Sequence, residues 1–186
     1  MKVRLTFLLF LILTTVSFVF AETGEKRIVV ICAGCHGTDG ASVGDSIPII
    51  GGQKADYLKK VMEEYKNDEK AGSVMNKIAK GYSDERINFV ANYFSSKKWV
   101  NTNKIYDNNL ANKGKKIAEV CYDCHGKLGE GIEAYPRIAG QPVFYLKQVL
   151  LDYKNSVLKS DEMSFVSEYS DDDLEALANY FSSIRR

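Results

Sequence analysis

Two pentapeptides, Cys32-Ala33-Gly34-Cys35-His36 and Cys121-Tyr122-Asp123-Cys124-His125, share the pattern Cys-x-x-Cys-His. They use all four cysteines and both histidines of the 186-residue chain. This pattern attaches c-type haem: each thiol bonds to one vinyl group of the porphyrin, and the histidine that follows is an axial ligand of the iron. We therefore predict two covalently attached haem c groups, on Cys32, Cys35, Cys121 and Cys124, with His36 and His125 as axial ligands.

Two other readings of the cysteine pairs remain open. The two pairs could hold one zinc ion, but zinc ribbons usually separate their pairs by about 15–20 residues. The separation between Cys35 and Cys121 is far longer. Disulfides or redox dithiols are possible in an exported protein. Neither alternative explains why both histidines follow their cysteines at the same offset.

The N-terminal segment has the pattern of a secretory signal peptide. Lys2 and Arg4 precede an apolar run over 5–20, and Val19-Phe20-Ala21 fits a small-residue cleavage site. We expect residues 1–21 to be removed and the mature chain to be periplasmic. An uncleaved membrane anchor is the alternative, although the run is short for a spanning helix of about 20 residues.

Composition narrows the classes of ligand. Loss of Lys2 and Arg4 changes the formal net charge from +1 to −1. No basic excess is then available to neutralise phosphates, so we expect no nucleic-acid partner. The sequence also has no G-x-G-x-x-G pattern, so we expect no flavin in this chain.

The chain repeats one unit at an offset of 87–89 residues. Gly52-Gln53 matches Gly140-Gln141, and the hexapeptide Ala-Asn-Tyr-Phe-Ser-Ser occurs at 91–96 and again at 178–183. Each unit is small for an unaided core, and a covalently held haem would add apolar bulk. The predicted division is a signal peptide at 1–21, a first domain at 22–98, a linker at 99–107 and a second domain at 108–186.

Apolar spacing indicates an all-α fold. Helices are expected at 24–35 and 108–124, ending at the two motifs, and around 57–65 and 145–153, where apolar residues recur at helical spacing. Ser83 and Ser170 are candidate N-caps of the closing helices, since acidic residues follow both. Trp99 is expected to pack at the domain boundary.

The repeat also selects the second axial ligands. No histidine remains, and the methionines after residue 21 are Met62, Met75 and Met163. Met75 and Met163 correspond at an offset of 88, whereas Met62 corresponds to the apolar helix residue Leu150. We therefore predict Met75 and Met163 as axial ligands, each in a loop, and Met62 as core. Histidine–methionine ligation raises the reduction potential and is typical of electron-transfer cytochromes.

Two prolines also match, about a dozen residues after each histidine. We expect the carbonyls of Pro48 and Pro136 to accept a hydrogen bond from the imidazole and orient its ring, as groups around metal ligands commonly do. Plain turn prolines are the alternative. Arg137 follows Pro136 and is either a partner for a haem propionate or a surface arginine.

These features resemble tandem class I cytochrome c domains over essentially the whole mature chain. The first half, in residues 32–44 (CAGCHGTDGASVG) and 74–83 (VMNKIAKGYS), is similar to the dihaem subunit of flavocytochrome c sulfide dehydrogenase. The second half, in residues 136–141 (PRIAGQ), resembles freestanding dihaem cytochromes that feed terminal oxidases. The resemblance implies ligation by His36 with Met75 and by His125 with Met163.

The resemblance also implies partners. In the sulfide dehydrogenase family an FAD-containing subunit oxidises sulfide, and the haem subunit passes the electrons to an external cytochrome c. On that reading this chain is a non-catalytic electron-transfer subunit with no catalytic residue of its own. The alternative is a freestanding carrier between a quinol-oxidising complex and a terminal oxidase. A haem peroxidase is disfavoured, because it would need an exchangeable axial ligand.

Overall fold

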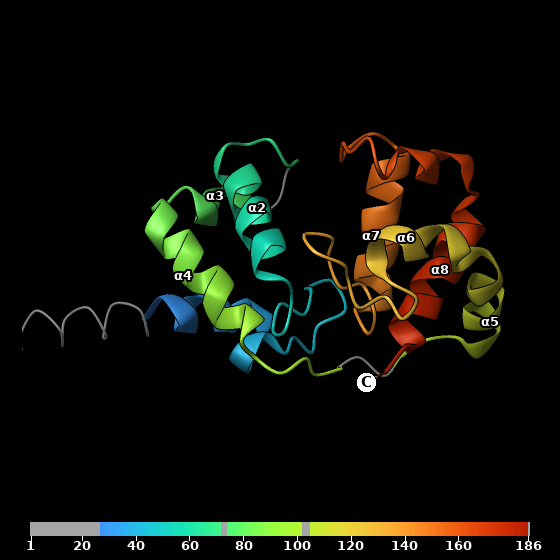
Figure 1. Cartoon of the computed structure of the whole chain (residues 1–186), viewed down its shortest axis with the longest axis horizontal. Helices are drawn as coiled ribbons and strands as arrows, with labels where there is room; N and C mark the ends of the chain where they lie inside the picture. Colours follow the sequence, from blue (N-terminus) through green and yellow to red (C-terminus); the bar gives the residue numbers. More distant parts are fainter. Residues whose placement is uncertain (1–26, 72–73, 102–104, 186) are drawn as a thin grey trace, which may run out of the picture.

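The computed structural model describes residues 27–71, 74–101 and 105–185 of the chain. These residues are helical or irregular and form no strand, as predicted. They form two helical halves that lie side by side (Figure 1). The predicted signal peptide falls outside the described residues. Within them, no helix is long and apolar enough to cross a membrane.

The first half contains a helix at 27–36, which ends on the first cysteine motif. It continues through η1 (Thr38–Gly40), α2 (Ala55–Lys66), α3 (Val74–Ala79) and α4 (Asp84–Ser95). The predicted cap at Ser83 is confirmed, since its side chain accepts a hydrogen bond from the Arg86 backbone N–H. The closing helix α4 buries its own apolar face in the core of this half; that face consists of Ile87, Val90, Ala91 and Phe94.

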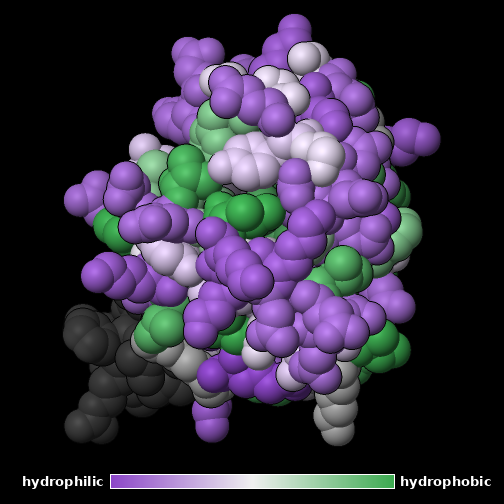
Figure 2. Space-filling model, turned by 90° about the vertical axis from the view of Figure 1, so that its right-hand side faces the viewer, coloured by the Kyte–Doolittle hydropathy of each residue, from purple (hydrophilic) through white to green (hydrophobic). Residues whose placement is uncertain are grey.

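The second half follows a similar order of elements, with local differences. It consists of α5 (Asn108–Ile117), η2 (Ala118–Cys121), α6 (Tyr122–His125), α7 (Val143–Lys154), η3 (Ser164–Glu168) and α8 (Asp171–Ser183). The single helix expected at 108–124 is therefore wrong in detail, because a 3-10 turn at η2 separates α5 from α6. The predicted cap at Ser170 is confirmed by its bond from Asp173 N–H. Seen from the side of this half, the surface is mostly hydrophilic, with smaller hydrophobic groups between (Figure 2).

Helices α5 and α8 pack closely because a glycine lies where they meet. A Cβ atom built on Gly114 would collide with the backbone carbonyl of Ala176 and lie 2.9 Å from the Tyr180 Cβ. No side chain fits there unless a backbone moves. The close approach lets Leu174, Leu177 and Phe181 of α8 enter the core of the second half.

We expect Gly114→Ala to lower the free energy of unfolding by about 1–3 kcal/mol, because overpacking must push α5 away from α8. Urea unfolding of the full chain would measure the change. Gly81→Ala is the matched control, since its nearest contact, 3.4 Å from the Ile78 carbonyl oxygen, is ordinary. An unchanged midpoint for Gly114→Ala would show that the helices separate at no cost.

The repeat extends to the loops that precede α2 and α7. In each loop a glycine of positive φ, 72° at Gly52 and 71° at Gly140, donates its N–H to the closing helix of its own half. The acceptors are the carbonyls of Phe94 and Phe181, both at 2.8 Å. The two glutamines that follow these glycines are therefore held in equivalent positions of the two halves.

Candidate haem sites

Each histidine of the two motifs is fixed in the predicted way. His36 Nδ1 lies 2.9 Å from the carbonyl oxygen of Pro48, and His125 Nδ1 lies 2.9 Å from that of Pro136. The predicted contact between the histidine and the proline carbonyl is therefore confirmed in both halves. A role as plain turn prolines does not account for these contacts. Since the carbonyl can only accept, Nδ1 carries the proton, and the other ring nitrogen, Nε2, keeps its lone pair for a metal.

The surroundings of both rings favour the neutral imidazole that metal binding requires. Burial lowers the pKa of His36, and the bond to Pro48 offsets this only in part. Burial lowers the pKa of His125 in the same way, against the bond to Pro136. Both imidazoles therefore stay neutral at pH 7.

The cysteines lie three residues apart on helical turns, so the two thiols of a pair project from one side of the chain. Cys32 and Cys35 belong to the helix at 27–36, whereas Cys121 ends η2 and Cys124 lies in α6. All four thiols are free. Burial raises the pKa of Cys32 and raises that of Cys121 to about 11. Reactive dithiols have a lowered pKa instead, so the redox-dithiol alternative loses support.

The predicted methionines differ in their local structure. Met75 lies in α3, not in the loop expected for it. Met163 does lie in a loop, directly before η3, and it is partly buried against the same apolar cluster as Cys121. Cys121 and Met163 therefore pack against the same apolar core of the second half. Met62 is only partly buried, on α2.

The residue after Met75 anchors its segment, and sequence reasoning missed it. The side chain of buried Asn76 donates to the backbone carbonyls of Tyr65 at 3.1 Å and Lys70 at 3.0 Å. These bonds tie α3 to the end of α2. The sequence carries no signal for this role, because the burial of Asn76 is seen only in the structure and the equivalent position in the second half is Ser164.

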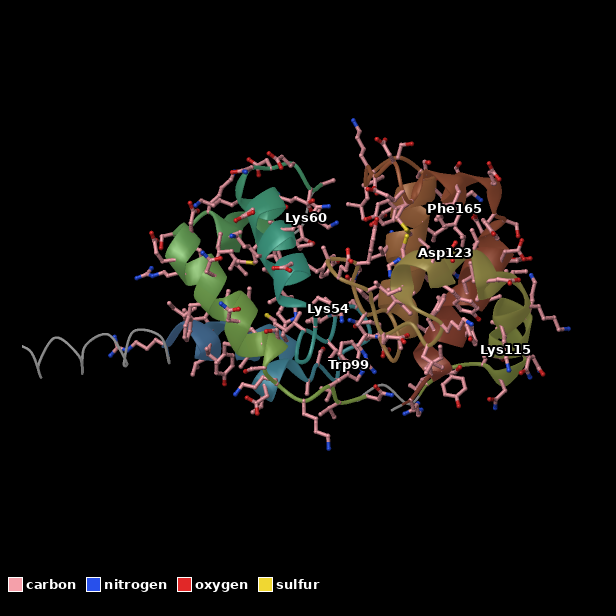
Figure 3. All side chains as sticks on the ribbon, viewed as in Figure 1. Lys54, Lys60, Trp99, Lys115, Asp123 and Phe165 are labelled. Atoms are coloured by element: carbon pink, nitrogen blue, oxygen red, sulfur yellow. The ribbon has the colours of Figure 1, made fainter. Side chains whose placement is uncertain are left out.

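Arg137 and Trp99 meet across the boundary between the halves. The Arg137 guanidinium lies 4.1 Å from the centre of the Trp99 ring, and Trp99 is buried. Trp99 lies between the two halves in Figure 3, so its predicted place at the boundary is confirmed. Arg137 is partly buried on it, which makes the surface-arginine alternative wrong.

The same boundary carries two matching pairs of hydrogen bonds. Gln141 accepts from Ile49 N–H at 2.9 Å and donates to Ile49 O at 2.8 Å. Gln53 accepts from Arg137 N–H at 2.8 Å and donates to Arg137 O at 2.9 Å. Each glutamine therefore binds the residue that follows the haem-site proline of the other half. In the sequence the two glutamines stand out only as matching positions of the repeat.

The residues fit covalent haem better than zinc. Within residues 27–71, 74–101 and 105–185, no three Cys, His, Asp or Glu side chains gather as a metal site, so the zinc reading finds no ligand set there. Apolar side chains next to the first motif and Met75 are exposed, namely Val30, Ile31 and Val74. A hydrophobic group that covered them would remove apolar surface from water.

Comparisons with known proteins agree with this chemistry. Residues 111–185 match the family described as "Cytochrome c". Cytochrome c4 of Pseudomonas aeruginosa is 28% identical over 178 residues, which cover 88% of each chain. Cytochrome c-554(548) of Halomonas halodenitrificans is 38% identical over 79 residues, 41% of this chain and 94% of that protein.

The first-half resemblance to a sulfide dehydrogenase subunit also finds a counterpart. The cytochrome subunit of sulfide dehydrogenase from Chlorobaculum tepidum is 43% identical over 75 residues, 40% of this chain and 67% of that protein. Among solved structures, reduced recombinant cytochrome c4 from Pseudomonas stutzeri superposes with a TM-score of 0.78 at 27% identity. That match covers 89% of this chain and 98% of the other.

Proposed function

Because this chain belongs to the cytochrome c family, we propose that its two halves each hold one covalent haem c and that it transfers electrons between other proteins. The observation that carries the proposal is the pair of equivalent 2.9 Å contacts from His36 to Pro48 and from His125 to Pro136. These contacts fix two imidazoles with Nε2 left for iron, one in each half.

Equivalent residues of the two halves have the same proposed roles. Haem c, when bound, supplies a one-electron iron couple. Cys32 with Cys35, and Cys121 with Cys124, would tether it, and His36 and His125 would each ligate one iron. Met75 and Met163 are the proposed second ligands. Two protein ligands per iron would keep the geometry nearly unchanged on oxidation and would suit electron transfer better than substrate chemistry.

For the electron route we propose a freestanding periplasmic carrier between a quinol-oxidising complex and a terminal oxidase. The likeness to cytochrome c4 over nearly the whole chain supports this role. Such a carrier needs transient docking that weakens as salt increases. The second candidate is the haem subunit of a sulfide-oxidising flavoprotein, which the 43% identity of one segment supports.

Purification from the native periplasm separates the two candidates. We expect about two haems per chain, no flavin, no reduction by sulfide alone, and oxidation by oxidase-containing membranes that slows with added salt. A flavoprotein that stays bound through two chromatography steps, with haem reduced by sulfide, would establish the second candidate instead. Absence of covalent haem would refute both.

A further inference from the structure

The proline carbonyl that binds each histidine belongs to a peptide group whose N–H is also bound. The Pro48 carbonyl accepts from His36 at 2.9 Å. The nitrogen of that same peptide group is the Ile49 N–H, which donates to Gln141 Oε1 at 2.9 Å. One peptide group therefore connects the proximal histidine of the first half to a glutamine of the second half.

The second half contains the matching chain of bonds. The Pro136 carbonyl accepts from His125 at 2.9 Å, and the N–H of the same peptide group, that of Arg137, donates to Gln53 Oε1 at 2.8 Å. Gln53 Oε1 also accepts from Lys54 N–H at 3.0 Å. The two chains cross, because each begins at a histidine of one half and ends at a glutamine of the other.

The glutamines are placed to act as fixed dipoles. Gln53 is 4% exposed and Gln141 3% exposed, and Ile49 is 1% exposed, so water has little access to the two glutamine amides. Each amide also donates Nε2–H to the carbonyl of the residue that it accepts from. This second bond fixes the orientation of the amide, since a flipped amide would place donor against donor and acceptor against acceptor.

We propose that Gln53 and Gln141 are positioning residues that tune the haem of the opposite half. Hydrogen bonds in a chain polarise one another. A glutamine oxygen on the peptide N–H makes the proline carbonyl a stronger acceptor, which draws the Nδ1 proton and makes the imidazole a stronger donor to iron. A stronger donor favours the oxidised iron. Each glutamine therefore lowers the reduction potential of the haem across the boundary.

The test uses the holoprotein and the variants Gln141→Leu and Gln53→Leu. We expect Gln141→Leu to raise the equilibrium constant for one-electron reduction of the haem on His36 about threefold to tenfold, where tenfold is about 59 mV. The haem on His125 should change by less than twofold. Gln53→Leu should raise the constant of the haem on His125 by the same factor and change that of the haem on His36 by less than twofold. Spectroelectrochemistry measures both constants. Gln148→Leu is the control, because Gln148 is exposed and bonds only to Asp152.

A second readout follows the hydrogen bond itself. The chain has only two histidines, so ¹⁵N-histidine labelling of the reduced protein gives two imidazoles, assigned by triple-resonance experiments. We expect Nδ1–H exchange of His36 to accelerate at least tenfold in Gln141→Leu and that of His125 in Gln53→Leu. If each glutamine affected its own half, both halves equally or neither, the proposal would be overturned.

If the leucine variants do not fold, Gln141→Glu provides the test. A carboxylate still accepts from Ile49 N–H but cannot donate. We therefore expect Nδ1–H exchange at His36 to stay slow, and the reduction constant of its haem to fall from the wild-type value by more than that of the other haem. Equal shifts of both haems would overturn the proposal. It rests on iron ligation by His36 and His125, which the wild-type spectrum tests first: an imidazole without iron at Nε2 would refute the proposed function before any glutamine variant is compared.

Discussion

Replacing Cys121 and Cys124 together by alanine is expected to leave a protein with about one covalent haem per chain instead of about two. The thiols of the second half are its only cysteines, so no other side chain can form the thioether bonds there. The first half keeps Cys32 and Cys35 in their own helix and should attach its haem as before. Acid–acetone extraction followed by the pyridine haemochrome spectrum would count covalent haem, and the intact mass would locate the loss.

Asp123→Ala is the matched control for this pair. Asp123 lies between the two cysteines and is exposed (Figure 3), so its loss should leave both haems attached. The mirror variant, Cys32→Ala with Cys35→Ala, should lose the other haem. Retention of two covalent haems in either double variant would refute the assignment of the motif that it removes.

Local features of the fold were readable from the sequence because they depend on nearby residues. Helical spacing located α2 and α7, and the serine caps depend on backbone groups three residues away. The histidine–proline bonds span 12 and 11 residues and were anticipated because the repeat presents the same proline twice. The break of the helix before the second motif was missed, since a 3-10 turn at η2 leaves no distinct pattern of residues.

The contacts between the halves could not be predicted in the same way. Gln53 and Arg137 are 84 residues apart, and Ile49 and Gln141 are 92 apart. No spacing rule relates such distant positions, and the repeat shows only that the glutamines are equivalent. Arg137 stands where the first half has Ile49, so the repeat gave no equivalent for its contact with Trp99. Such pairs become visible only when the halves are seen together.

We expect Met75→Ala and Met163→Ala each to lower the potential of one haem, on the order of 0.1 V within the about 0.8 V range that axial ligands span. The thioether stabilises reduced iron, and alanine cannot replace it. The open position should then bind carbon monoxide, whereas the wild-type protein, in which we propose that both irons have two protein ligands, should resist it. Spectroelectrochemistry and the carbonyl difference spectrum would measure the two effects.

Met62→Ala separates ligation from the general loss of a methionine. Met62 lies on α2 and is partly buried, as the two proposed ligands are. Its replacement removes the same thioether but should leave both potentials within a few hundredths of a volt, by the same scale of axial-ligand effects. A fall of potential in Met62→Ala and none in Met75→Ala would reverse the assignment for the first haem.

Because α3 carries Met75 and is anchored by Asn76, Asn76→Ala should loosen the ligand without removing it. That variant should therefore bind carbon monoxide more slowly than Met75→Ala and more readily than the wild type.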